Sequence, residues 1–161
     1  MDEVSAREAL DVSRETLERV EAFLALLREE NERQNLVSRA TLDHVWSRHV
    51  VDSAQLIQHA PASARRWLDL GTGAGFPGLI VACLFPGEVT LVESRKLRVD
   101  FLARAADLLG VTARTSIVHA NIANLQAPPF DVISARAFAP LPKLLTLAER
   151  FSTDETRWIL P

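Results

Sequence analysis

The spacing of apolar residues changes partway along the chain and divides it into two parts. Between residues 13 and 33 the apolar positions recur every three, four or seven residues, which predicts an amphipathic helix. A second helix is predicted to begin with Thr41 as its N-cap and to end before Pro61. We therefore expect a helical segment, residues 1–60, to precede a different kind of structure.

From about residue 65, short apolar runs alternate with helical segments. This alternation predicts an α/β fold with a mainly parallel sheet and an N-terminal helical extension. We expect residues 1–60 to form a helical cap and residues 61–161 the α/β core, packed together as one globular unit. The strands are predicted at residues 67–70, 89–92, 115–119, 130–134 and 157–160, and the helices at 79–85, 95–109 and 141–151.

Composition places the chain among ordinary globular proteins. It has 161 residues, 48% of them hydrophobic and 24% charged, and a net charge of −3. The longest strongly apolar run, residues 79–85, is far shorter than the roughly 20 residues of a membrane span. The acidic N-terminus lacks the apolar core of a signal peptide. A single cysteine, Cys83, excludes an internal disulfide, so we expect a cytoplasmic protein.

Charge is unevenly distributed. The first thirty residues carry nine acidic and four basic side chains, so an acidic helix precedes a mildly basic body. Sixteen of the eighteen basic residues are arginine, whose planar fork suits phosphates and base edges. Solvated helix faces would explain the same usage.

A glycine-rich segment follows the first predicted strand. Gly71, Gly73 and Gly75 alternate there, and Glu93 ends the second strand. Ligands of parallel sheets bind beyond the carboxyl ends of the strands, where glycine lets the backbone approach them. A carboxylate in the place of Glu93 can accept hydrogen bonds from ribose hydroxyls. Together these residues predict a site for a nucleoside-containing cofactor.

The glycine spacing distinguishes between such cofactors. It differs from the Gly-x-Gly-x-x-Gly of dinucleotide sites and lacks the Gly-Lys-Ser/Thr of nucleotide hydrolases. An NAD(P)-dependent oxidoreductase and an NTPase are thus disfavoured. The pattern Asp-x-Gly-x-Gly-x-Gly, beginning at Asp69, resembles the first motif of class I, Rossmann-like methyltransferases that use S-adenosylmethionine.

The segment after the fourth strand, Ser134-Ala-Arg-Ala-Phe138, borders the transferring methyl group in that architecture. It contains no cysteine, which excludes cytosine C5 chemistry through a thiolate, and no Asn-Pro-Pro-Tyr type segment. A ring nitrogen such as guanine N7 needs no general base, only positioning. Arg136 is the candidate for that positioning role: it could hold a phosphate, a guanine O6 or the cofactor carboxylate. It could also merely pair with a surface carboxylate.

The segment Arg48-His-Val-Val-Asp-Ser53 allows two interpretations. His49 falls on the apolar helix face, as a core histidine would, and Arg48 and Asp52 have the spacing of a helix ion pair. Alternatively, His49 and Asp52 support the cofactor loop. His44 and His49 are five apart rather than the four that places two ligands on one face, so no metal site is predicted.

Several motifs in this order resemble the RsmG (GidB) family, bacterial methyltransferases that form N7-methylguanosine in 16S ribosomal RNA. They are Asn35-Leu-Val37, Arg48-His-x-x-Asp-Ser53, Asp69-Leu-Gly-Thr-Gly-Ala-Gly-Phe-Pro-Gly78 and Ser134-Ala-Arg-Ala-Phe138, within a resemblance over about residues 17–161. The resemblance implies S-adenosylmethionine as cofactor, 16S rRNA of the small ribosomal subunit as partner, and a monomer. It implies cofactor contacts at Gly71, Phe76, Ile122, Ala123 and Arg136, with Glu93 on the ribose.

Two positions depart from the family pattern. Ala123 stands where the family often has an acidic residue, so Asn121 or Asn124 could help to hold adenine. Leu97 stands near a position that is often basic, and Lys96 or Arg98 could substitute. The candidates for RNA contact are Arg48, His49, Arg95, Lys96 and Arg98, together with Arg33 and Arg39.

Two alternatives remain open at this point: a class I methyltransferase of a small molecule or protein, and a non-catalytic module that binds S-adenosylmethionine or RNA. Class I methyltransferase sheets normally have seven strands, and only five are predicted here. We therefore expect the C-terminal strands of the sheet to be missing and its edge strand to be prone to pairing.

Overall fold

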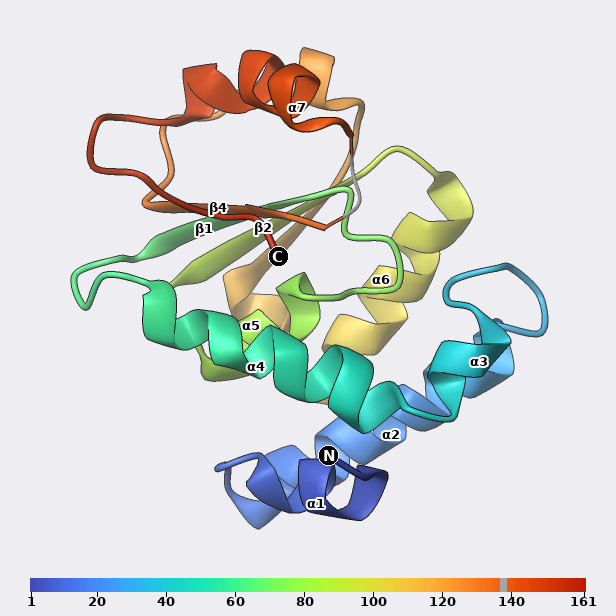
Figure 1. Ribbon diagram of the computed structural model, residues 1–161. Helices are drawn as coiled ribbons and strands as arrows, with labels where there is room; N and C mark the ends of the chain where they lie inside the picture. The colour runs from blue at the N-terminus through green and yellow to red at the C-terminus, as the bar shows by residue number, and fades with distance from the viewer. Residues whose placement is uncertain (137–138) are drawn as a thin grey trace.

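The computed structural model describes residues 1–136 and 139–161, so Ala137 and Phe138 of the predicted arginine segment lie outside the described residues. Five parallel strands form one sheet in the order β3-β2-β1-β4-β5 (Figure 1). This confirms the predicted α/β class and all five strands, with ends shifted by up to two residues. The strands are β1 (Arg66–Leu70), β2 (Glu88–Glu93), β3 (Thr115–His119), β4 (Val132–Ala135) and β5 (Arg157–Ile159).

Helices connect the strands and precede them. The helices in the described part of the chain are α1 (Glu3–Ala9), α2 (Arg14–Glu30), α3 (Arg39–Leu42), α4 (Asp52–Gln55), α5 (Gly78–Leu84), α6 (Lys96–Leu109) and α7 (Leu141–Ala148). Short 3₁₀ turns are η2 (Leu56–His59), η3 (Thr112–Arg114), η4 (Ile122–Asn124) and η5 (Glu149–Phe151), and η1 (Trp46–Val51) is a π-helical turn. None of these helices has the length and apolar character that crossing a bilayer requires.

The second predicted helix differs from the expectation at its start. Ser38, not Thr41, is the N-cap, because the Ser38 hydroxyl accepts from the Thr41 amide over 3.3 Å. Thr41 itself lies within α3, and its hydroxyl donates back to the Ser38 carbonyl. The segment is also not one regular helix, since α3, η1, α4 and η2 follow one another. The first helix, α1, was not predicted: it has seven residues, of which only Ala6 is buried, so it shows little periodicity.

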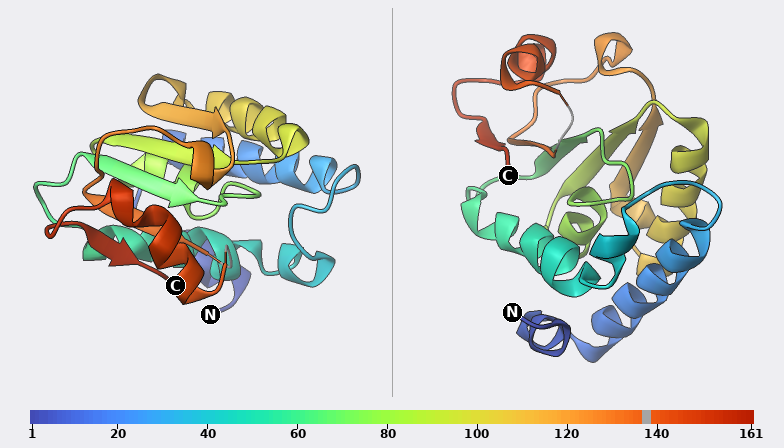
Figure 2. Two further views of the ribbon diagram at one scale, coloured as in Figure 1. Left: turned by 90° about the horizontal axis from the view of Figure 1, so that it is seen from above. Right: turned by 45° about the vertical axis from the view of Figure 1, so that its right-hand side comes forward.

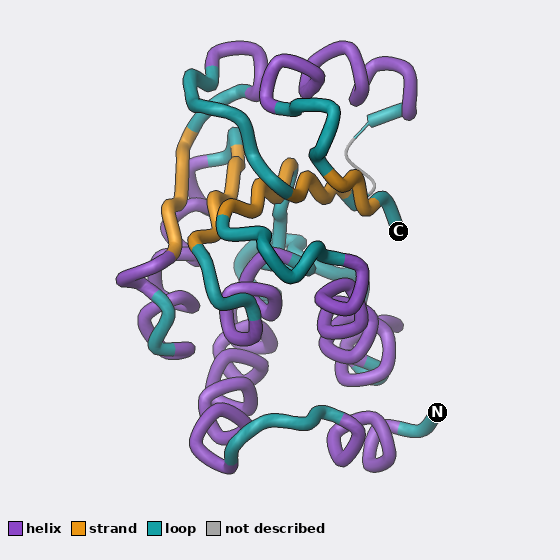
Figure 3. Tube along the Cα trace, turned by 90° about the vertical axis from the view of Figure 1, so that its left-hand side faces the viewer, coloured by secondary structure: helices purple, strands orange, loops and turns teal. Residues whose placement is uncertain are grey.

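The sheet lies between two helical layers. Figure 2 and Figure 3 show α7 over one face, and α5, α6 and the N-terminal helices on the other. The face under α7 buries Leu68, Ile133 and Phe151 in one cluster. On the opposite face, Phe23 and Leu27 of α2 belong to the same hydrophobic cluster as residues of the sheet and α6; that cluster includes Trp67, Phe85 and Phe101.

Polar contacts also join the N-terminal helices to α6. Glu30, buried at the end of α2, accepts a hydrogen bond from Arg104 over 2.6 Å. That hydrogen bond lowers the pKa of Glu30, although burial opposes the shift. The side-chain amide of Gln34 donates to the Leu97 carbonyl at the start of α6. These contacts thus fix the helical segment against α6, the helix that follows β2.

Candidate functional site

The glycine segment turns back against the end of β2. The Gly71 amide donates to the Val92 carbonyl over 3.0 Å, and Gly71 has a φ of 63°. Gly75 has a φ of 97°, and a Cβ added there would lie 2.5 Å from Cδ1 of Leu79. Residues with a side chain rarely adopt that backbone conformation, and Leu79 would have to move to make room for a Cβ. Gly75 therefore packs the loop against α5, and its contact with the cofactor remains a prediction.

A buried polar network, which the local sequence patterns did not predict, anchors this loop. One oxygen of Asp69 accepts from the Ser134 hydroxyl over 2.8 Å, and the other accepts from the Gly78 amide over 3.0 Å. The Trp67 indole donates to the Ser134 hydroxyl. Burial raises the pKa of Asp69 to about 6, although the hydrogen bonds from Ser134 and Gly78 oppose the shift. A lone carboxylate in the apolar run of residues 67–70 was the available signal.

A cavity of about 610 Å³ opens at the carboxyl edge of the sheet, where β1, β2 and β3 end. We call it the strand-end cavity. It brings together five of the residues predicted to hold the cofactor, Gly71, Glu93, Asn121, Ile122 and Ala123, with Arg95 and Arg98. Lys143 and Leu147 of α7, which no local pattern indicated, also line it, with Val92, Ser94, Ala120 and Ala139.

Glu93 is the acidic group of the strand-end cavity. It is 5% exposed, and its carboxylate accepts from the Ser94 amide over 2.8 Å. Its other oxygen lies 3.4 Å from one terminal nitrogen of Arg98. The second terminal nitrogen of Arg98 donates to the Asn35 carbonyl. A carboxylate offers about four acceptor positions, so capacity remains for ligand hydroxyls. Arg98 neutralises the charge of Glu93 and joins it to the segment that follows α2.

The segment after β3 presents backbone groups to the same cavity. The side-chain oxygen of Asn121 accepts from the Ala123 amide over 3.1 Å and caps η4. Arg150 donates to the carbonyls of Ile122 and Leu125. The Ile122 side chain itself is buried in the core. This arrangement fixes a turn beside Glu93 at which a flat heterocycle could meet backbone atoms.

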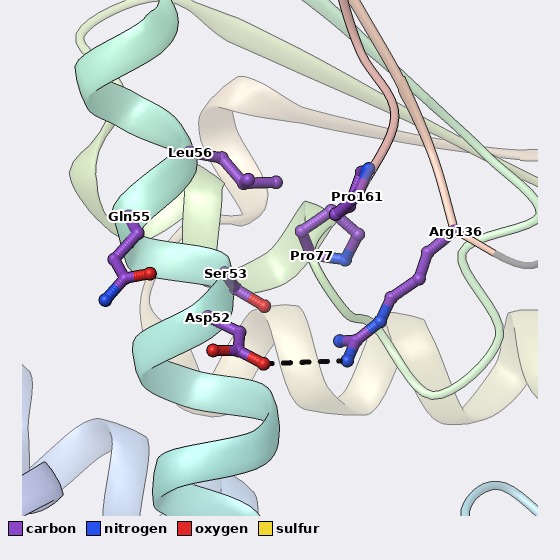
Figure 4. A pocket seen from close by; sticks show the side chains of 7 residues that line it. All are labelled: Asp52, Ser53, Gln55, Leu56, Pro77, Arg136 and Pro161. Atoms are coloured by element: carbon purple, nitrogen blue, oxygen red, sulfur yellow. Dashed lines mark ion pairs between the residues drawn. The ribbon is translucent and has the colours of Figure 1, made fainter. Parts of the chain in front are cut away.

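Arg136 does not line the strand-end cavity. It lines a neighbouring hollow of about 270 Å³, which also includes Ser53, Gln55, Leu56, Pro77 and Pro161. Figure 4 shows its guanidinium pointing toward Asp52, 3.9 Å from the carboxylate. The same group lies 3.4 Å from Nδ1 of His49 and donates to the Arg48 carbonyl over 3.1 Å. Arg136 therefore meets residues 48–53, which we call the cap motif. We call Arg48, His49, Asp52 and Arg136 the arginine cluster.

Phe76 connects the arginine cluster to the glycine segment. Its ring is 6% exposed and stacks on the His49 ring, with centroids 4.8 Å apart and planes at 16°. Burial and the neighbouring Arg136 guanidinium lower the pKa of His49 to about 4, so the ring is neutral at neutral pH. Phe76 and Gly73, both predicted to contact the cofactor, do not line the strand-end cavity, and their contacts with it remain predictions.

The predicted RNA-contact residues differ in their surroundings. Arg95, Lys96 and Arg98 share a surface hollow of about 400 Å³ with Gln34, Asn35 and Leu97. Lys96 pairs with Asp100 and Arg98 with Glu93, whereas no ion pair involves Arg95 within the described residues. On the cap, Arg33 pairs with Glu29 and Glu30, and Arg39 with Glu32. Within residues 1–136 and 139–161, no group of three or more His, Cys, Asp or Glu could hold a metal ion.

Solved structures share this fold at low identity. A putative O-methyltransferase from Klebsiella pneumoniae superposes with a TM-score of 0.68 at 18% identity, covering 99% of this chain and 70% of that one. A methyltransferase from Thiobacillus denitrificans, in complex with S-adenosyl-L-homocysteine, gives 0.58 at 18%, covering 94% and 56%. The [4+2]-cyclase SpnF gives 0.60 at 16%, covering 86% and 54%. Since a cyclase is among these structures, the fold does not establish the reaction.

Sequence relatives are more specific. The chain is 48% identical over 160 residues to the ribosomal RNA small subunit methyltransferase G of Zymomonas mobilis, covering 94% of this chain and 72% of that protein. It is 53% identical over 146 residues to the protein of the same name from Erythrobacter litoralis, covering 90% and 70%. The family model described as GidB, rRNA small subunit methyltransferase G, matches residues 16–160. The chain therefore belongs to the GidB family of rRNA small subunit methyltransferases, as the resemblance of its motifs predicted.

Proposed function

We propose that this protein uses S-adenosylmethionine to methylate N7 of a guanine in 16S ribosomal RNA. The observation that carries the proposal is the strand-end cavity, in which a glycine loop, Glu93 and the turn after β3 converge in a chain of the GidB family. The proposal also places the protein in the cytoplasm as a monomer, with residues 1–60 as a helical cap on a core of residues 61–161.

The residues of the cavity fit such a cofactor. Glu93 retains acceptor capacity for two ribose hydroxyls, and Asn121 to Ala123 would hold the adenine through backbone atoms. Gly71 lets the backbone approach the ligand closely. With Ala123 in place of an acidic residue, Asn121, whose side-chain oxygen accepts from the Ala123 amide, would offer its side-chain NH₂ group for added hydrogen bonds.

The chemistry needs little from the protein beyond placement. When bound, S-adenosylmethionine would supply a methyl group on a positively charged sulfur. Transfer to N7 would form a carbon–nitrogen bond as the carbon–sulfur bond breaks and S-adenosylhomocysteine leaves, so no proton would have to be removed from N7. Arg136 would act as the positioning cation at the end of β4, and its three contacts with the cap hold it in one orientation. Orientation of this kind can lower a barrier by several kcal/mol, about 7–11 in ideal cases. We assign no general base.

The RNA would approach across the start of α6 and the cap. Arg95, Lys96 and Arg98 line the hollow next to the strand-end cavity, and Arg48 and His49 lie on the cap. Of these five, Arg48, Arg95 and Lys96 are exposed, and Lys96 is paired with Asp100. Arg95, which also lines the strand-end cavity, is the cation we expect to meet a phosphate first. Phosphate contacts release counterions, so binding should weaken as salt increases.

The experiment supplies methyl-labelled S-adenosylmethionine and small ribosomal subunits from cells that lack this modification. After incubation, the RNA is digested and its nucleosides are separated. Labelled N7-methylguanosine supports the proposal. Its absence, with a chain that is folded and binds S-adenosylhomocysteine, would overturn it. A label on another nucleoside would keep the methyltransferase and reject guanine N7.

A further inference from the structure

His49, in the segment 48–53 of the cap, contacts both the glycine segment and the arginine segment. Its ring stacks on Phe76 with centroids 4.8 Å apart. Its Nδ1 lies 3.4 Å from a guanidinium nitrogen of Arg136. The ring belongs to the π-helical turn η1, a type of helical irregularity that is frequent at functional sites.

The geometry around Arg136 comes largely from this turn. One of its terminal nitrogens donates to the Arg48 carbonyl over 3.1 Å and lies 3.9 Å from the Asp52 carboxylate; the other faces His49. A guanidinium is planar and offers its donors in a fixed fork. Three acceptors from one helical segment therefore set both the position and the plane of the group (Figure 4 shows the Asp52 contact).

The imidazole must be neutral to take part. A neutral ring can accept at one nitrogen only if the proton sits on the other. Nδ1 accepts from Arg136, so the proton is assigned to Nε2, which is buried and has no hydrogen-bond partner among the described residues. The charged groups that act on the ring are Arg136, Asp52, Arg48 and Glu3 of α1, and burial with Arg136 outweighs the acids. An apolar ring such as that of phenylalanine could pack here without a buried N–H. The unpartnered Nε2–H costs free energy, so packing alone does not explain a histidine at this position.

We propose that His49 is a positioning residue for methyl transfer: through Nδ1 it aligns the Arg136 guanidinium, and through its stacked ring it fixes Phe76 of the glycine segment. This inference rests on the proposed function. It gives His49 a role through Arg136 in place of the direct RNA contact that the sequence suggested. The cap then holds the segments after β1 and β4 in one arrangement.

Two variants separate the two contacts. His49→Phe keeps an aromatic ring against Phe76 but removes the acceptor at Nδ1. His49→Asn places an acceptor near the position of Nδ1 but removes the stacked ring. His44→Phe is the matched control, since His44 is an exposed histidine of the same segment.

We expect His49→Phe to unfold at the same temperature as the wild type and to lower kcat by about 10- to 100-fold, as small misplacements do. His49→Asn should recover part of that loss, and His44→Phe should match the wild type. In an Arg136→Ala background, His49→Phe should cause little further loss, because the two residues act as a unit. A fully active His49→Phe, or an undiminished loss in that background, would overturn the inference while leaving the proposed function intact.

A second readout does not depend on methyl transfer. NMR titration of the His49 imidazole in the folded protein should show a low pKa that rises in Arg136→Ala, because the neighbouring cation is removed. An unchanged pKa would show that the two groups are not coupled and would overturn the inference even if no transfer were detected. A wild type that forms no N7-methylguanosine but shows the pKa rise would contradict only the proposed function.

Discussion

Asp69 accepts a hydrogen bond from Ser134 over 2.8 Å, and the two residues are also register partners in the parallel pair of β1 and β4. The same carboxylate accepts from the Gly78 amide at the start of α5. This buried carboxylate therefore joins β1 and β4 to α5. The glycine segment follows β1, and the arginine segment follows β4. The relative placement of these two segments depends on this carboxylate.

The Asp69 carboxyl should make stability depend on pH with a definite sign. Its pKa in the fold, about 6, lies above its ordinary value, so the stability it contributes is present at low pH and is lost as pH rises through about 6. In Asp69→Asn this loss should disappear, changing the pH dependence of the unfolding free energy by on the order of 2–3 kcal/mol between pH 4 and 6.

Urea unfolding of both proteins at each pH gives the measurement. Subtraction at equal pH removes the contribution of His49, whose low pKa acts in the opposite direction: its cost grows as pH falls from about 6.5 toward about 4. Asp43→Asn, an exposed change, is the control. A difference between wild type and Asp69→Asn that stays constant from pH 4 to pH 7 would contradict this prediction.

Replacement of Glu93 should weaken the cofactor site without unfolding the protein. Glu93→Gln keeps the shape but removes the charge that ribose hydroxyls would meet. Hydrogen bonds to charged groups contribute about 1.5–3 kcal/mol, so binding should weaken by about 10- to 100-fold. Calorimetric titration with S-adenosylhomocysteine measures it, with Glu88→Gln at the exposed start of β2 as control. Equal affinities for Glu93→Gln and wild type would remove Glu93 from the site.

Gly75→Ala should destabilise the protein. The new Cβ would lie 2.5 Å from Leu79 Cδ1, in a backbone conformation that alanine rarely adopts. Overpacking and backbone strain each cost about 1–3 kcal/mol. Urea unfolding gives the loss, and Gly73→Ala is the informative comparison. Gly73 also has a positive φ, but the nearest atom to its added Cβ is 3.9 Å away. If both variants lost the same amount, backbone strain alone would explain the effect.

The ion pair between Arg104 and Glu30 should stabilise the docking of the cap helix α2 on α6. Arg104→Ala would leave the Glu30 carboxylate buried with a weakened set of partners, at a cost of about 1–3 kcal/mol. The exposed pair of Arg14 with Glu18 offers the control, since exposed pairs contribute about 0–1 kcal/mol. Chemical unfolding of the two variants should therefore differ. An Arg104→Ala protein as stable as Arg14→Ala would show that apolar packing alone holds the cap.

Arg95 should contribute to RNA affinity through charge. Its removal in Arg95→Gln should weaken binding to 16S rRNA fragments similarly for all sequences and reduce the salt slope by about 1. Filter binding at several salt concentrations measures the slope. Arg14→Gln on the acidic cap is the matched change far from the strand-end cavity. A slope identical to that of the wild type would exclude a phosphate contact at Arg95.

Local sequence patterns were sufficient for the strands, for the helices between them and for part of the site, but not for α1 or for the irregular segment from α3 to η2. The change of period near residue 65 predicted the parallel sheet, and the three glycines with Glu93 predicted the strand-end cavity, because the carboxyl ends of neighbouring parallel strands must lie at one edge. The predicted start of the second helix was wrong. Ser38 and Thr41 are both residue types that favour the N-cap position, and only the hydrogen bonds between them decide which one occupies it.

The sequence by itself determined the fold class, the family and the position of the acidic group at the end of β2, because each depends on periodicity or on a motif within a few residues. Only the tertiary structure decided which distant polar groups meet. Ser134 reaches Asp69 from 65 residues away, and Arg136 reaches His49 from 87 residues away. These pairings depend on how the cap packs against the sheet and on which strands are neighbours, and no local pattern specifies either.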